Sequence, residues 1–246
     1  MEFRIKQFRK PIIKQAIMIT GFPGIGNVGK IAIDFLIDHL KPVKIMEIES
    51  DSFPHSVFVT EQGLLEMPSV RLYYKKVKNN EFIFVSGDAQ PVTEEACYAF
   101  CNKLLSIAKE LKVKEIITMG GIGLGKIPKK PKVYIAGNNK NYIKGFPNCN
   151  IKIYGVVGPI MGVTGVLAGM AKDMLSAVIL SQTFAHPVYL GVKGAKEILA
   201  VLNQKYGFKL DIKKIADDIN GFEEEMVSSQ EQLLAKPNKG GMTYFG

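Results

Sequence analysis

The chain has 246 residues, with 32 Lys or Arg against 23 Asp or Glu, and a formal net charge of +9. Hydrophobic residues make up 47% and charged residues 22%, which excludes intrinsic disorder and lets one large or two small domains bury a core. Three cysteines without a CxxC pair favour neither a disulfide scaffold nor a structural zinc site, and they indicate a reducing compartment.

The positively charged residues include few of the arginines that nucleic-acid-binding proteins use. All of the cationic residues are lysines except Arg4, Arg9 and Arg71, and it is Arg that reads phosphates and base edges with a planar fork. The first eleven residues lack the apolar region of a signal peptide, and the apolar stretch at 156–171 is interrupted by Pro159 and four glycines. We therefore expect a cytoplasmic protein that binds neither nucleic acid nor membrane.

The first half of the chain alternates predicted strands with predicted helices. Apolar runs closed by turn residues indicate strands, and apolar residues at spacings of three and four indicate helices. The strands fall at 16–20, 43–48 and 82–87, with antiparallel strands or a hairpin insertion between 56 and 77. One helix runs through Ile31 and Leu36, and another is capped by Thr93 and carries Glu94 and Glu95 in its first turn.

The same alternation continues in the second half. Strands are predicted at 115–120, 133–137, 151–158 and 177–182, with helices at 162–172 and 193–206 and a last helix from Asp211. The lysines at 126–132 are interpreted as a solvated loop, because no aromatic side chains interleave with them. This order predicts a single α/β domain over residues 1–235 with a C-terminal helical pair, followed by a flexible tail at 236–246.

The sharpest local motif is a glycine-rich turn between the first strand and its helix. Gly24, Gly26 and Gly29 form GxGxxG there, and Glu47 stands near the end of the next strand, as in a dinucleotide fingerprint. In that interpretation the helix amides face a pyrophosphate and Glu47 accepts from a ribose hydroxyl. Alternatively, the glycines only let the helix pack closely on its sheet. The local pattern leaves both open.

The sequence contains few other patterns that indicate catalysis or metal binding. The three histidines are scattered, and neither HExxH nor GxSxG occurs. Cys97 and Cys101 share a helical face, but two thiols supply at most half of a metal site, so we interpret them as core residues. We therefore predict no catalytic residues, no metal and no cofactor.

The C-terminal residues differ in kind from the rest of the chain. The segment 235–241 has the composition of a tether, and the sequence then ends with Tyr244, Phe245 and Gly246. Two aromatic rings beside a terminal carboxylate suit a pocket on another protein. A disordered or back-folded end is the alternative, and the sequence leaves both open.

Four segments together resemble the archaeal members of the proteasome assembly chaperone family, a family sometimes labelled ATP-grasp-like although no ATP-grasp pattern occurs here. They are GFPGIGNVGKIAIDFLI, GGIGLG, GPIMGVTGVLAGMA and TFAHPVYLGVKGAKEILAVLNQKYGFKLDIKKI. The resemblance covers the chain from about Gln15 onward. It implies a three-layer α/β/α sandwich like that of the nucleoside phosphorylases, without their catalytic residues, in which the turn at 24–29 is architectural.

The resemblance also implies a partner. Proteins that dock on the proteasome α ring, some archaeal relatives among them, end in a hydrophobic residue, a tyrosine and any residue. Tyr244, Phe245 and Gly246 are similar to that motif, with Phe in place of the penultimate Tyr. We therefore expect a non-enzymatic assembly chaperone or adaptor, forming a homo-oligomer, that binds proteasome α subunits. The alternative is a nucleotide- or nucleoside-binding enzyme that uses the glycine turn and Glu47.

Overall fold

A computed structural model of the protein describes residues 2–60, 62–151, 158–187 and 189–211. The chain divides into two units, Met1–Leu210 and Asp211–Gly246. The helix predicted from Asp211, the tail at 236–246 and most of the strand predicted at 151–158 lie outside the described residues. The domain boundary expected at residue 235 therefore stays a prediction, and the architecture below is that of the first unit.

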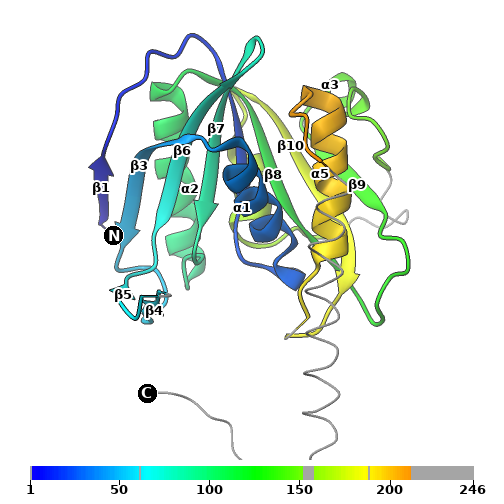
Figure 1. Ribbon diagram of the computed structural model, residues 1–246, viewed down its shortest axis with the longest axis horizontal. Coiled ribbons are helices and arrows are strands. Elements are labelled where there is room, and N and C mark those ends of the chain that lie inside the picture. The colour runs from blue at the N-terminus through cyan, green and yellow to red at the C-terminus, as the bar shows by residue number, and fades with distance from the viewer. Residues whose placement is uncertain (1, 61, 152–157, 188, 212–246) are drawn as a thin grey trace, which may run out of the picture. The chain divides into compact units, whose positions relative to one another are not determined.

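Eight strands of this unit form one mixed sheet. They are β1 (Phe3–Gln7), β2 (Ala16–Gly21), β3 (Val43–Ser50), β6 (Val70–Val77), β7 (Asn80–Gly87), β8 (Val113–Leu124), β9 (Val133–Gly137) and β10 (Leu175–Phe184). Their order across the sheet is β1-β3-β6-β7-β2-β8-β10-β9 (Figure 1). The central strands β7, β2, β8 and β10 pair in parallel, and the pairs outside them are antiparallel. Two short strands, β4 (Phe58–Val59) and β5 (Leu65–Glu66), pair only with each other.

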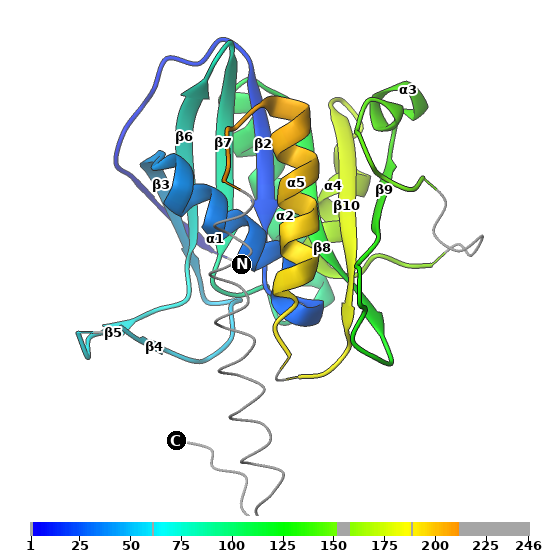
Figure 2. The ribbon, with the colours of Figure 1, turned by 45° about the vertical axis from the view of Figure 1, so that its right-hand side comes forward.

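Helices cover both faces of this sheet. Helix α1 (Val28–Leu40) packs on β2 and β8 and contacts α5 (Val192–Tyr206), while α2 (Glu94–Glu110) contacts α4 (Gly162–Met170) on the other face. Figures 1 and 2 show α1 and α5 in front of the sheet and α2 behind it. A 3-10 turn, η1 (Ile25–Asn27), precedes α1, and the short α3 (Lys140–Lys144) follows β9. The α/β class predicted from the alternation is confirmed.

The helix boundaries follow the capping residues that the sequence offers. The backbone N–H of Ala96 donates to Thr93 Oγ1 over 3.2 Å, so Thr93 caps α2 as predicted, and Glu94 and Glu95 lie in its first turn. Helix α5 ends at Gly207, whose φ of 66° is the left-handed conformation that glycine accepts without strain. The start of α2 and the end of α5 are therefore set by their capping residues.

The core between the sheet and α2 centres on Phe100. Its side chain is fully buried, and its ring centroid lies 5.9 Å from those of Phe3 and Phe22 and 5.6 Å from that of Phe53. Cys97 and Cys101 are buried free thiols in the same core, as predicted, and burial raises the pKa of the Cys101 thiol. Every residue of β2 is buried, as expected for a strand covered on both faces.

Three elements differ from the prediction or were not predicted. Strand β8 continues to Leu124, through glycines that were expected to form a loop, because β10 pairs with it in parallel along that whole length. Strand β1 is a mostly exposed edge strand, and α3 has a single buried residue. Neither of the last two has the apolar periodicity by which sequence analysis finds an element.

We expect Phe100→Ala to lower the free energy of unfolding by about 3 to 5 kcal/mol, because it removes a fully buried ring from the aromatic cluster. Tyr98→Ala on the same helix is the matched control: its side chain is 53% exposed, so the change should stay within about 0.5 kcal/mol. Urea unfolding followed by circular dichroism compares the two, and similar losses would place Phe100 outside the core.

Candidate functional site

Strands β2, β7, β8 and β10 run in the same direction, so their carboxyl ends share one edge of the sheet. Ligands of open α/β sheets bind at that edge, because the loops that follow the strands converge there. The glycine turn, a cavity and an ion-pair network all lie along this edge or beside it. The predicted partner-binding residues Tyr244, Phe245 and Gly246 lie outside the described residues.

The three motif glycines have different structural roles. Gly26 has a φ of 60°, and an added Cβ would lie 2.6 Å from Thr183 Oγ1; a Cβ on Gly29 would lie 2.2 Å from the carbonyl oxygen of Met119. Gly24 is extended, and its Cβ would meet nothing within 4 Å. Gly26 and Gly29 are therefore required by the turn and by the close packing of α1 on β8, whereas Gly24 is not.

A cavity of about 490 Å³ lies beside this turn. Its walls come from Phe22 and Ile25, from the glycines of β8, and from the residues that lead into α4. Gln90 joins two of these walls: its Nε2 donates to the carbonyl oxygen of Pro23, and its Oε1 accepts from the backbone N–H of Val163 over 2.8 Å. The volume falls within the range of small-ligand pockets.

The residues around the cavity carry no charge. All sixteen are glycine, apolar, threonine, proline or glutamine, so among the described residues no Lys or Arg faces a bound phosphate there. A pyrophosphate would meet only backbone amides and the dipole of α1. The walls are better suited to an apolar, uncharged group than to an anion.

Glu47 lies away from the glycine turn. It is on β3, and β6 and β7 separate that strand from β2, which puts it about 14 Å to the side at the usual strand spacing. Its Oε1 accepts from Arg71 Nε over 3.0 Å, and its Oε2 lies 3.4 Å from Lys44 Nζ. The structure thus does not bring Glu47 together with Gly24, Gly26 and Gly29, as a ribose contact would require.

Instead, Glu47 belongs to an ion-pair network that sequence analysis missed. Arg71 also contacts Asp88 at 3.0 Å, and Lys30 of α1 contacts Asp34 at 2.7 Å and Asp88 at 3.8 Å. Burial alone would raise the pKa of Glu47, but the charges of Lys44 and Arg71 outweigh it and lower the pKa. The network ties α1 to three strands of the sheet. A signal was available, because Arg71 is one of only three arginines in the chain.

The serine within this network is a structural link. Ser86 is buried, its hydroxyl donates to Asp34 Oδ1 over 2.6 Å, and Lys30 Nζ donates to it over 3.0 Å. A nucleophile needs access to substrate, which this hydroxyl lacks. Within the residues that the structure describes, no group of three His, Cys, Asp or Glu side chains could hold a metal ion. None of the described helices is both long and apolar enough to span a bilayer.

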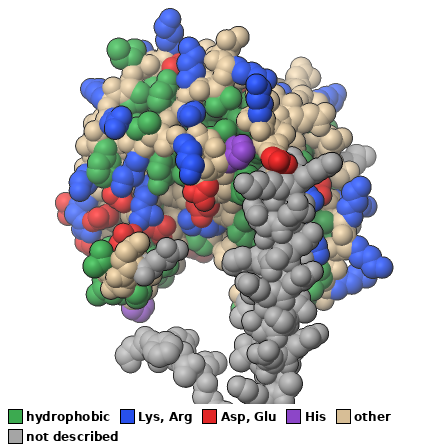
Figure 3. Space-filling model, in the orientation of Figure 1, with side chains coloured by type: hydrophobic (Ala, Val, Ile, Leu, Met, Phe, Trp, Pro, Cys, Tyr) green, Lys and Arg blue, Asp and Glu red, His purple; other side chains and the backbone are tan. Residues whose placement is uncertain are grey.

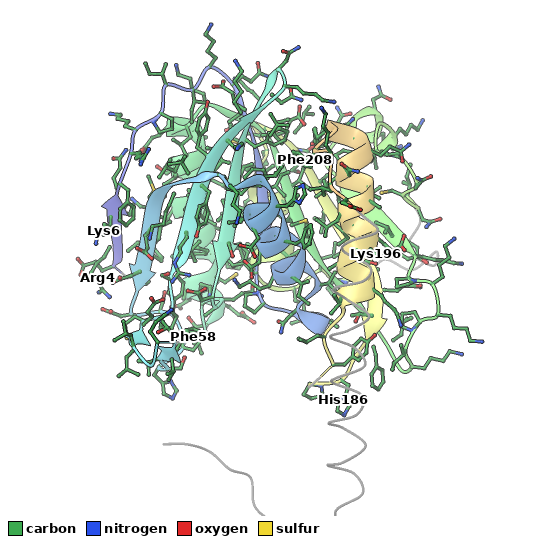
Figure 4. All side chains as sticks on the ribbon, in the orientation of Figure 1. Arg4, Lys6, Phe58, His186, Lys196 and Phe208 are labelled. Carbon is green, nitrogen blue, oxygen red and sulfur yellow. The ribbon has the colours of Figure 1, made fainter. Side chains whose placement is uncertain are left out.

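The hairpin formed by β4 and β5 lies within the segment 56–77, where antiparallel strands or a hairpin insertion were predicted, but sequence analysis did not identify its exposed apolar surface. It projects from the same side of the molecule as the network, and Phe58 is labelled within it in Figure 4. Figure 3 shows hydrophobic side chains gathered over it, below a band of mixed acidic and basic residues. Six of its apolar residues are exposed: Val57, Phe58, Val59, Leu64, Leu65 and Met67.

A scan against protein-family models matches residues 18–230 with the model described as "PAC2 family". The chain belongs to the PAC2 family. A relative from Methanocaldococcus jannaschii, described as an uncharacterized protein, is 25% identical over 247 residues, which cover 95% of this chain and 93% of that protein. The resemblance to archaeal proteasome assembly chaperones, inferred above from the residues, is confirmed at the level of the family.

Solved structures extend this comparison. PbaB of Pyrococcus furiosus, described as an archaeal proteasome activator, is 28% identical to this PAC2 protein with a TM-score of 0.83, over 93% of this chain and 99% of that one. PbaA of the same organism, described as an archaeal homolog of proteasome-assembly chaperone, is 24% identical with a TM-score of 0.76, over 94% and 92% of the two chains. The PbaA likeness shows the shared fold.

We expect Gly26→Ala to destabilise the protein by about 2 to 4 kcal/mol, because the new Cβ sits at a left-handed φ and crowds Thr183. Gly24→Ala is the control, with a change within about 0.5 kcal/mol, since its Cβ points into open space. Thermal unfolding measures both, and calorimetric titration of the parent with NAD and ATP should give no saturable heat. Saturable binding that Gly24→Ala weakens would instead favour the dinucleotide interpretation.

We expect Arg71→Met to cost about 2 to 4 kcal/mol at pH 7, because Glu47 and Asp88 lose their shared guanidinium while remaining mostly buried. The lowered pKa of Glu47 means that its contribution to stability is complete above its unfolded pKa and is lost as the pH falls through its folded pKa. The cost of the substitution should therefore shrink in acid. Urea titrations at several pH values measure it, with the exposed Arg4→Met as control; an unchanged cost in acid would contradict the pairing.

Proposed function

We propose that this PAC2 protein binds the proteasome core particle, as an assembly chaperone or activator without enzymatic activity of its own. The observation that carries the proposal is the likeness to the proteasome activator PbaB, which extends over 93% of this chain and 99% of PbaB with a TM-score of 0.83. The uncharged cavity supports it, because an enzyme acting on nucleotides would need cationic or catalytic groups there.

We assign the contact with α subunits to the last three residues of the sequence, Tyr244, Phe245 and Gly246. The two rings can bury apolar surface in a pocket between α subunits, while the terminal carboxylate makes a charge-assisted contact. Gly240 and Gly241 give the segment reach. Ordering this segment costs conformational entropy, so one copy binds weakly, and a homo-oligomer that presents several tails binds tightly through effective concentration.

A second candidate is a nucleotide- or nucleoside-binding enzyme at the glycine turn. It is favoured by the open space at Gly24 beside the cavity and the nearby N-terminus of α1. Two observations weigh against it: the described residues of the cavity walls carry no charge, and Glu47, on the distant strand β3, is engaged by Arg71 and Lys44. We therefore rank it below proteasome binding.

The tail assignment predicts that deleting Tyr244, Phe245 and Gly246, or adding one alanine after Gly246, weakens binding to archaeal core particles by about tenfold or more. The added residue displaces the carboxylate while leaving both rings in place, so it separates charge from apolar burial. Surface plasmon resonance with immobilised core particles measures the affinity. Circular dichroism and light scattering serve as controls, since the fold and mass of the protein should not change.

Phe245→Tyr restores the hydroxyl of the motif at the penultimate position. We expect this variant to bind at least as tightly as the parent and to increase hydrolysis of a fluorogenic peptide by the core particle. Unchanged affinity in both the deletion and the extension would contradict the tail assignment and leave the globular surface as the contact. Absence of any binding by the parent would contradict proteasome binding itself.

A further inference from the structure

The hairpin of β4 and β5 exposes an apolar surface that nothing in the described part of the chain covers. Val59 and Leu65 are paired across it and are 68% and 69% exposed, and Met67 is 58% exposed. A two-stranded hairpin with strands this short is marginal in water by itself. Contiguous exposed apolar residues on a soluble domain mark an interaction surface.

The strand register shows which side chains share a side of the hairpin. Val59 and Leu65 point to one side of the hairpin, and by alternation Val57 and Met67 share that side. Phe58 and Glu66, which pair with each other, point to the other side. Glu66 contacts Arg71 Nη2 on strand β6 at 3.4 Å, which turns its side of the hairpin toward the sheet. We call the side made of Val57, Val59, Leu65 and Met67 the outer face of the hairpin; Phe58, on the other side, is also 45% exposed.

Charge is segregated along the chain in a way that points to the partner. Residues 45–70, which include the hairpin, contain five acidic residues and no Lys or Arg. This group stays net acidic when its ion-pair partners Arg4, Lys44 and Arg71 are counted. Residues 116–172, by contrast, contain eight lysines and no acidic residue. The acidic segment and the basic segment complement each other.

The basic segment includes the loop between β8 and β9, which follows directly from the cavity wall. Lys126, Lys129, Lys130 and Lys132 are exposed, and none of them makes an ion pair with a described residue. At the cavity itself Ile25 is 51% exposed and Met161 is 81% exposed. The opening of the cavity is therefore apolar and lies beside lysines that make no ion pair with a described residue; we call the loop between β8 and β9 the lysine loop. It complements the hairpin, which is apolar and belongs to an acidic segment.

The two surfaces belong to different parts of the sheet. Pairing directions show that β3 runs parallel to β2 and β8, so the hairpin and the lysine loop both follow carboxyl ends. Four strand spacings, about 19 Å, separate β3 from β8. Figure 2 shows the hairpin extending away from the sheet on the side opposite to β10 and β9. The two surfaces of one copy therefore do not meet.

We propose that copies of this chain associate head to tail: the outer face of the hairpin of one copy covers the cavity mouth of the next, beside its lysine loop. Such a heterologous contact uses two different surfaces and closes into a ring when the rotation permits. The inference deepens the homo-oligomer of the proposed function but does not depend on proteasome binding, because it concerns the protein alone.

The test begins with the mass of the parent and of two variants in analytical ultracentrifugation, without proteasome. Leu65→Asp with Met67→Asp charges the hairpin face, and Met161→Asp charges the cavity mouth. Because all three side chains are largely exposed in a single copy, the fold should persist in the variants, and far-UV circular dichroism checks that it does. Ile12→Asp is the matched control, since Ile12 is 91% exposed and lies near the amino end of β2. We expect the parent and the control to be oligomers, and each interface variant to raise the dissociation constant at least about tenfold.

Mixing the two interface variants tests the head-to-tail arrangement. The hairpin variant retains an intact cavity mouth and the cavity variant retains an intact hairpin, so the mixture should form a one-to-one heterodimer that cannot extend. Lys129→Glu with Lys130→Glu should also weaken the parent oligomer, with a smaller effect at high salt.

Several outcomes would overturn the proposal. The proposed interface would be ruled out if the parent is a monomer at about 100 µM. It would also be ruled out if either interface variant forms the same oligomer as the parent. Two monomeric variants that form no heterodimer indicate a symmetric contact instead. A hairpin variant that keeps its mass but loses affinity for core particles assigns the hairpin to the proteasome. Loss of proteasome binding in the tail variants with normal mass would leave this inference standing, so the two proposals fail separately.

Discussion

The close contact between the backbone of α1 and the strands beneath it determines the rest of the carboxyl edge. A Cβ on Gly29 would lie 2.2 Å from the Met119 carbonyl oxygen, and one on Gly21 would lie 2.1 Å from the carbonyl oxygen of Gly29. The helix can rest there only because both positions lack a side chain. The chain then has to enter the helix through a tight turn, with Gly26 and Asn27 at positive φ. The cavity is the space left between this turn, β8 and the start of α4.

Charged and uncharged residues occupy different parts of this edge of the sheet. Arg71, Lys30 and their carboxylate partners gather on the side of β3, β6 and β7, where they satisfy one another and hold α1 in place. The cavity lies on the side of β8 and α4 and is walled by neutral residues. The neutral side of this edge is thus suited to contact with apolar groups. This agrees with the proposal that the protein acts by binding another protein.

Arg71 also contacts the hairpin, through Glu66. Glu66 lies on the side of the hairpin that contacts Arg71, and Val59 and Leu65 on the other side are 68% and 69% exposed. A domain usually buries such apolar side chains, because burial of apolar surface stabilises the fold. An exposed apolar hairpin is stabilised when a partner covers it. Association of copies would in turn bring several C-terminal segments together, which links this local feature to tight binding of a multivalent target.

The sequence by itself determined the alternation of strands and helices, the cap at Thr93, the stop at Gly207 and the core position of Cys97 and Cys101, because these depend on local periodicity and on contacts within a few residues. The family resemblance was also readable from it. Only the tertiary structure decided which strands are neighbours. Glu47 follows the glycine turn by one strand along the chain but lies three spacings away in the sheet, since β6 and β7 insert between. The uncharged cavity and the arginine network have the same origin: each is made by residues far apart in sequence, whose meeting depends on long-range pairing that no local pattern encodes.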